Sequence, residues 1–156
     1  MRLIGYTALI TIVLDRLSKI LVVDYLQLDI LGRIEVFPPF LNFVMAWNRG
    51  INFGIGSNDN DLMRWGLVAL AIAICAGLLV WGRRSTGFRV PFSIGLVIGG
   101  ALGNVWDRVQ YGAVADFLNM SCCGLYNPYA FNIADVAIFA GALGLILFAG
   151  KETKGA

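Results

Sequence analysis

Long uncharged apolar segments constrain the fold of this chain more than any other feature of its sequence. One runs from Trp65 to Trp81 and another from Val90 to Trp106, and an arginine precedes each of them. A helix needs about 17 to 25 residues to cross a bilayer. Since 58% of the 156 residues are apolar and only 14% are charged, the composition is unlike that of a water-soluble domain. We therefore expect one integral membrane domain, residues 1–156.

Two further apolar segments lie near the ends of the chain. The first runs from Leu3 to Leu14 and reaches Val23 if the polar residues between them are tolerated, and the last runs from about Tyr129 to Gly150. The first has features of a signal peptide, but no small-x-small cleavage site follows it, which favours a retained helix. The predicted fold class is an all-α membrane protein with four transmembrane helices, at about residues 3–23, 62–82, 90–110 and 129–150.

Lysine and arginine set the predicted orientation, because the cytoplasmic links of membrane proteins carry an excess of both. Arginines crowd the short link between the second and third helices, and lysines lie in the tail after Gly150. The segment from Gln110 to Tyr129 contains neither residue type. We therefore expect both termini in the cytoplasm, with segments 24–61 and 110–129 at the outer face.

The outer link, about residues 24–61, is predicted to form a small β-sheet between the first two helices. Its apolar residues recur with a period close to two, which is typical of strands: Ile34, Val36, Leu41, Phe43, Met45 and Trp47. Pro38-Pro39 is expected to form the turn between strands, and Gly50, Gly54 and Gly56 to break the later part into loops. Two roles remain open for this sheet, a surface cap without chemistry and a platform that holds an extended peptide.

The chain contains no histidine, which excludes several kinds of active site at once. Ser-His and Cys-His nucleophiles are absent, and so are most zinc sites. Ser18 and Lys19 are adjacent, and neighbours on a helix point about 100° apart, so a serine activated by this lysine is not expected. A pair of carboxylates is the remaining candidate.

Asp116 and Asp135 are the best-placed carboxylates. Asp116 follows the predicted third span, and Asp135 lies just inside the fourth, so both are expected near the outer interface. A charge at membrane depth costs at least ~2.5 to 3.5 kcal/mol, which makes such a residue a functional candidate. Two carboxyl groups in a low-dielectric site share one proton, so one acts as base toward water. The alternative is that each caps a helix or pairs with Arg108.

The predicted third span carries both small and polar residues. Gly95, Gly99 and Gly103 recur every four residues, which favours close packing against another helix. Asn104 and Arg108 are also four apart, so their side chains point into one region near the outer end. Arg108 is interpreted either as a partner of an aspartate or as an anchor for the acids or a lipid headgroup.

Asp15 and Lys19 are four residues apart in the predicted first span. We expect a neutralised ion pair, which lets a helix carry both charges through a membrane. A competing interpretation is a small proton-coupled transporter or channel whose path comprises Asp15, Lys19, Asp107, Arg108 and Asp135. Polar residues gathered near one face argue against it, because a transporter site lies near the midplane. Several polar groups lie near one face, and each costs free energy at membrane depth. Their number also argues against a purely structural membrane protein.

Five segments resemble the signature blocks of the bacterial lipoprotein signal peptidases, or signal peptidase II, in order and in spacing. They are Asp15–Lys19, Asn48–Gly54, Gly99–Arg108, Val114–Phe117 and Phe131–Asp135. The resemblance extends from the first span to the last. Two positions depart from the usual pattern of the family: Arg16 stands where glutamine is common, and Asn52 stands where a small residue is common.

This resemblance implies a multi-pass aspartic endopeptidase of the bacterial inner membrane, with its active site near the outer face. It implies a prolipoprotein substrate, cleaved just before a cysteine that bears a diacylglyceryl group, and contact with membrane lipids. Asp116 and Asp135 would form the catalytic dyad, with no metal, no other cofactor and no nucleic-acid partner. Residues implied to support the dyad or contact the substrate are Asp15, Lys19, Asn48, Gly100, Asn104, Arg108 and Asn132.

Overall fold

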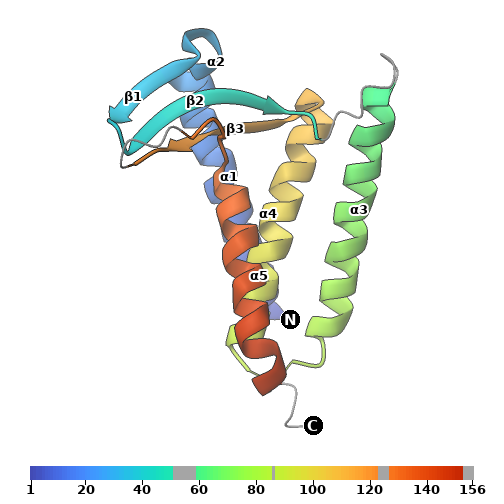
Figure 1. Ribbon diagram of the computed structural model, residues 1–156. Helices are drawn as coiled ribbons and strands as arrows, with labels where there is room; N and C mark the ends of the chain where they lie inside the picture. Colours follow the sequence, from blue (N-terminus) through green and yellow to red (C-terminus); the bar gives the residue numbers. More distant parts are fainter. Residues whose placement is uncertain (51–58, 86, 123–126, 153–156) are drawn as a thin grey trace.

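The structure, a computed structural model, describes residues 1–50, 59–85, 87–122 and 127–152. It is mostly helical, with a three-stranded antiparallel sheet at one end of the helices (Figure 1). The long helices are α1 (Arg2–Lys19), α3 (Asp59–Gly82), α4 (Arg89–Tyr111) and α5 (Ile133–Glu152). The strands are β1 (Arg33–Phe37), β2 (Leu41–Asn48) and β3 (Val114–Met120). Between α1 and β1 lie a π-helical segment, η1 (Ile20–Tyr25), and a short helix, α2 (Leu28–Leu31).

Helix α4 is the central helix and packs against α1, α3 and α5. The predicted small-residue face is confirmed, because it lies against α1. A Cβ atom on Gly95 would lie 2.5 Å from Cβ of Thr7, and one on Gly99 would lie 2.6 Å from Cβ of Thr11. No larger side chain fits at these positions without moving α1. Glycines therefore set the short distance between the two helices.

Three helices of the described chain, α3, α4 and α5, are long and apolar enough to cross a membrane. Helix α1 differs because four of its 18 residues are charged, namely Arg2, Asp15, Arg16 and Lys19. Helices α3 and α5 have exposed faces that carry large apolar residues such as Leu70 and Phe139. Such faces suit a lipid environment rather than water.

The sheet has the strand order β1-β2-β3. The predicted turn at Pro38-Pro39 is confirmed, since these residues link β1 to β2. The prediction that the sheet lies wholly within residues 24–61 is wrong, because β3 follows α4 and pairs with β2. β3 is buried on both faces along most of its length, so it lacks the alternation that marks a strand with one face in water.

Helix α5 begins at Ile133 rather than at the predicted residue 129. Phe131 forms an antiparallel bridge with Leu118 of β3, so the chain is held beside the sheet before the helix can begin. Among the glycines expected in loops, Gly50 follows β2 with a φ of 91°, a conformation that favours glycine. Gly54 and Gly56 lie outside the described residues.

Candidate active site

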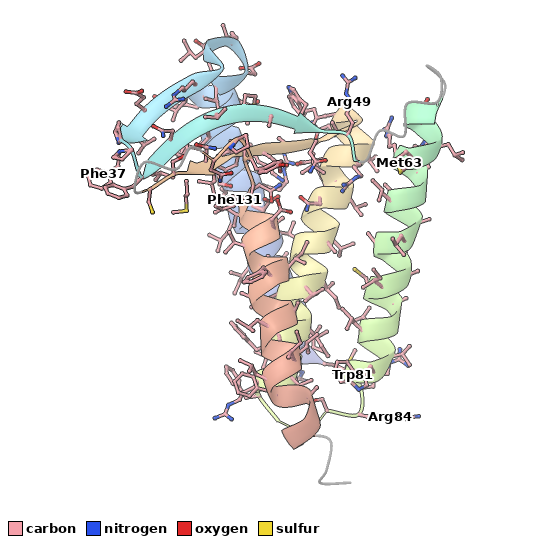
Figure 2. The ribbon with its side chains drawn as sticks, viewed as in Figure 1. Phe37, Arg49, Met63, Trp81, Arg84 and Phe131 are labelled. Atoms are coloured by element: carbon pink, nitrogen blue, oxygen red, sulfur yellow. The ribbon has the colours of Figure 1, made fainter. Side chains whose placement is uncertain are left out.

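The bridge between β3 and the start of α5 brings the two candidate aspartates to one place. Asp116 is the third residue of β3, and Asp135 lies in the first turn of α5. The amides of Phe117 and Leu118 both donate to the carbonyl of Phe131. Figure 2 shows Phe131 at this junction, between the sheet and α5. The carboxyls therefore lie at the end of the helices that carries the sheet.

Asn132 connects the two aspartates directly. Its Nδ2 donates to Oδ1 of Asp116 at 2.7 Å, and its Oδ1 accepts from the backbone amide of Asp135 at 2.9 Å. Oδ2 of Asp135 in turn accepts from the backbone amide of Asn132 at 3.3 Å. Asn132 is fully buried. The side chain of Asn132 thus contacts the carboxyl group of Asp116 and the backbone that carries Asp135.

Asp116 receives a second hydrogen bond from the neighbouring strand. Nδ2 of Asn48 donates to Oδ2 of Asp116 at 3.1 Å. Asp116 is 3% exposed, and burial, followed by the nearby charge of Asp135, raises its pKa to about 6. The amides of Asn48 and Asn132 act in the opposite direction, because hydrogen bonds stabilise the ionised form. The result is a carboxyl group that holds a proton far more readily than an exposed aspartate.

Asp135 is held by the central helix. Nδ2 of Asn104 donates to Oδ1 of Asp135 at 2.9 Å, and Oδ1 of Asn104 accepts from Asn132 at 3.2 Å. Arg108 lies one turn further along α4 and donates from Nη1 to the carbonyl of Asn104 at 3.3 Å. Within the described part of the chain, Arg108 forms no ion pair with either aspartate. The sequence left two structural roles open for Asp116 and Asp135, helix capping and pairing with Arg108. Of these, the described residues show only helix capping by Asp135.

The predicted ion pair in α1 is confirmed, and it belongs to a larger group of charges. Nζ of Lys19 lies 2.8 Å from Oδ2 of Asp15 and 2.6 Å from Oδ2 of Asp107. Arg16 also pairs with Asp107. Sequence reasoning assigned neither Arg16 nor Asp107 to the site. Asp107 lies four residues after Gly103, so continuing the small-residue spacing by one step would have placed it on the face toward α1.

Gly100 lies on a different face of α4, toward α5. A Cβ atom there would lie 2.8 Å from Cγ1 of Ile138 and would also collide with the carbonyl of Ala134. Gly100 therefore supports the site by letting the first turn of α5 approach α4. Asn52, one of the two departures from the family pattern, lies outside the described residues.

The arrangement offers two carboxyl groups with different surroundings, held by three asparagines. Across the described residues, no group of three or more Asp, Glu, Cys or His side chains is placed to hold a metal ion. Two carboxyls that share a proton can act as acid and base toward a water molecule and a carbonyl group. Such chemistry suits hydrolysis of an amide bond.

Comparisons with known proteins agree on one family. Residues 7–150 match the family model for signal peptidase (SPase) II. The chain is 43% identical over 145 residues to the lipoprotein signal peptidase of Methylorubrum extorquens, an alignment covering 92% of this chain and 83% of the relative. It is 39% identical over 150 residues to the lipoprotein signal peptidase of Caulobacter vibrioides, covering 94% and 87%.

Solved structures show the same fold. One structure of a bacterial membrane enzyme superposes with a TM-score of 0.79 at 28% identity, covering 96% of this chain and 94% of the other. A second bacterial membrane enzyme gives a TM-score of 0.75 at 26% identity, covering 98% and 91%. The similarity therefore extends over nearly the whole length of the chain.

Proposed function

The chain belongs to the signal peptidase II family and cleaves signal peptides from prolipoproteins, and we propose that it does so as an aspartic endopeptidase with Asp116 and Asp135 as the catalytic pair. The observation that carries this proposal is the position of Asn132, which is hydrogen-bonded to both aspartates. A water molecule bound by two such carboxyls lies where it can attack a peptide carbonyl.

The raised pKa of Asp116 favours this residue as the holder of the shared proton. In the proposed reaction, Asp135 takes a proton from water while the water oxygen bonds to the peptide carbon, and Asp116 protonates the carbonyl oxygen. The tetrahedral intermediate then collapses. The carbon–nitrogen bond breaks, the leaving nitrogen takes the proton held by Asp135, and a hydroxyl proton of the intermediate returns to Asp116. No covalent enzyme intermediate is formed.

We propose four membrane spans, with α1 as the fourth. Its 18 residues reach about 27 Å at roughly 1.5 Å per residue, and η1 extends it further. Asp15 and Lys19 are buried and paired within the protein, which removes most of the cost of carrying charge through lipid. The proposed membrane is a bacterial inner membrane, with the link between α3 and α4 and both termini on its cytoplasmic side. The arginines of that link support this orientation, because cytoplasmic links carry an excess of lysine and arginine.

The proposed substrate carries a diacylglyceryl group on the cysteine that follows the cleavage site. The dyad lies at the ends of helices that expose apolar side chains, where a lipid-modified cysteine would meet the membrane interface. The lipid chains can remain among membrane lipids while the peptide bond reaches the carboxyls. The signal peptide itself, an apolar helix, would approach between the helices from the side.

The transporter alternative gains no support from the same geometry. Its five candidate residues lie in the last turns of α1 and α4 and the first turn of α5. These turns meet at one end of the molecule (Figure 1). A proton path would need titratable groups distributed along the length of the helices.

The test uses the purified protein in detergent with a diacylglyceryl-modified precursor and its unmodified counterpart. We expect cleavage of the modified precursor alone, and loss of cleavage in Asp116→Asn and in Asp135→Asn. The matched control is Asp61→Asn, because its side chain is 81% exposed and lies outside the dyad. Normal cleavage by either dyad variant would refute the aspartic mechanism. Equal cleavage of both precursors would refute the lipid requirement.

A further inference from the structure

The backbone amide that precedes each dyad aspartate donates to another buried aspartate. The amide of Ala115 donates to Oδ2 of Asp107 at 3.2 Å, and the amide of Ala134 donates to Oδ1 of Asp15 at 3.1 Å. Ala115 directly precedes Asp116, and Ala134 directly precedes Asp135. A shift of either acceptor would therefore move the backbone that carries a catalytic carboxyl group.

A single ammonium group joins these two acceptors. Nζ of Lys19 lies 2.8 Å from Asp15 and 2.6 Å from Asp107. The side chains of Asp15 and Asp107 are fully buried, and that of Lys19 is 2% exposed. Lys19 thus fixes the separation of two carboxylates, and each carboxylate holds the residue before one member of the dyad.

Arg16 supplies the charge that balances Asp107. Its Nη1 contacts Oδ1 of Asp107, and its guanidinium lies 6.0 Å from the ring centre of Trp106 and 5.9 Å from that of Tyr111. With two cations and two carboxylates, the group is neutral overall. Removal of one partner from a buried ion pair leaves an uncompensated charge. Arg16 is also one of the two positions at which this chain departs from the usual pattern of the family.

We propose that Asp107 is a positioning residue for Asp116, acting through the amide of Ala115, and that Arg16 is the counter-charge that pairs with Asp107 in this chain. Lys19 pairs with both Asp107 and Asp15. It therefore connects the support of Asp116 to the support that Asp15 gives to Asp135 through the amide of Ala134. The inference rests on the aspartic mechanism proposed above. Displacement of a reacting group by about 1 Å can cost roughly 100-fold in rate, so the expected effect falls on kcat.

The charge of this group also acts on the dyad at short range. Titratable and charged groups that face Asp116 come from three helices: Lys19 of α1, Arg108 of α4 and Asp135 of α5. From β2 only the neutral amide of Asn48 faces it. A change of net charge beside Lys19 should therefore move the pH profile of kcat in a direction set by its sign.

The first measurement compares two double variants of equal charge in detergent, with a diacylglyceryl-modified precursor as substrate. Arg16→Gln combined with Asp107→Asn retains an acceptor for the Ala115 amide. Arg16→Gln combined with Asp107→Leu has a branched side chain with the same number of heavy atoms and no acceptor. We expect kcat of the leucine variant to be at least about tenfold lower than that of the asparagine variant, with KM unchanged within about twofold. Equal kcat values in two folded variants would overturn the positioning role.

The second measurement is the pH profile of kcat for the single variants. Arg16→Gln leaves an excess negative charge, which should move the alkaline limb, set by loss of the proton on Asp116, up by about half a pH unit, and Asp107→Asn should move it down by a similar amount. The Arg16→Gln, Asp107→Asn double variant should return it to the native position. Arg84→Gln is the control, because it removes a cation at the opposite end of the molecule (Figure 2). Identical profiles for both single variants would overturn the inference even where the leucine variant fails to fold.

Asp116→Asn is assayed in parallel, so that failure of the inference and failure of the proposed mechanism are distinguishable. Cleavage by Asp116→Asn would contradict the aspartic mechanism itself. An inactive Asp116→Asn together with native behaviour of all Asp107 variants would contradict only the positioning role.

Discussion

Asn132 and Asp135 hydrogen-bond each other in both directions at the start of α5. Oδ1 of Asn132 accepts from the Asp135 amide, and Oδ2 of Asp135 accepts from the Asn132 amide. This is the geometry of a capping box, which satisfies donors that a helix N-terminus leaves free. Asp135, one of the two proposed catalytic aspartates, is therefore also part of the cap of its own helix. Its carboxyl orientation is coupled to the first turn of α5.

Substitution of Asn132 separates its capping role from its role at the dyad. Asn132→Ala removes both, whereas Asn132→Ser retains a capping oxygen and loses the amide that donates to Asp116. We expect a stability loss of about 1 kcal/mol for alanine, little loss for serine, and about a 10- to 100-fold fall in kcat for both. Thermal unfolding and cleavage assays in detergent check this. Native activity in Asn132→Ser would show that the amide donor is dispensable.

The buried carboxyl of Asp116 should make stability depend on pH. Its pKa is raised from 3.8 to about 6 in the folded protein, so the folded state binds its proton more tightly than the unfolded state does. Stability should therefore fall as pH rises from about 4 through 6, and the loss should be complete above the folded pKa. Asp116→Asn should raise the free energy of unfolding at pH 7.5 by about 1 to 2 kcal/mol.

Thermal unfolding at several pH values measures this effect. The advantage of Asp116→Asn over the native chain should shrink as the pH falls from 6 and vanish below the unfolded pKa of 3.8, where the carboxyl is protonated in both states. Asp61→Asn is the control, because its side chain is 81% exposed. A stabilisation by Asp116→Asn that stays constant across this range would contradict the assigned cause.

Local spacing was sufficient to predict the features that depend on one helix. Gly95 and Gly99 lie on one face because they are four residues apart, and that face is where α1 packs. Asp15 and Lys19 form the expected pair for the same reason. Helical geometry alone decides these relationships.

Contacts between distant segments could not be predicted in this way. Arg16 and Asp107 are 91 residues apart, and although the four-residue spacing puts Asp107 on the small-residue face of α4, it does not indicate which residue of another helix Asp107 meets. Strand β3 was missed because it is buried on both faces, which removes the alternation that identified β2. Asp116 could be identified as a candidate because a charged side chain in an apolar chain carries a free-energy cost. Its position on a strand beside Asn48 could not be predicted, because it depends on how β3 pairs with β2.

Cleavage should not depend on a metal ion. In the proposed reaction Asp116 and Asp135 perform every proton transfer. Treatment with EDTA or 1,10-phenanthroline should therefore leave kcat and KM unchanged. The matched control is a zinc peptidase assayed in the same detergent, which must lose activity under the same treatment. Loss of cleavage that added zinc restores would contradict a mechanism based on carboxyls alone.

Gly100 should be intolerant of even one added methyl group. An alanine Cβ would lie 2.8 Å from Cγ1 of Ile138 and collide with the carbonyl of Ala134, so the first turn of α5 must move away from α4. Overpacking of this kind costs about 1 to 3 kcal/mol. The displaced turn carries Asp135, so kcat should fall at least about tenfold in Gly100→Ala.

Gly77→Ala is the matched control for this substitution, because nothing lies within 4 Å of the added Cβ in α3. Alanine is favoured over glycine inside a helix by up to about 1 kcal/mol, so this variant should be as stable as the native chain or slightly more so, with native activity. Thermal unfolding and cleavage of the modified precursor are compared for the two variants. If Gly100→Ala matched Gly77→Ala in both measurements, close approach of α5 to α4 would not be what holds Asp135 in place.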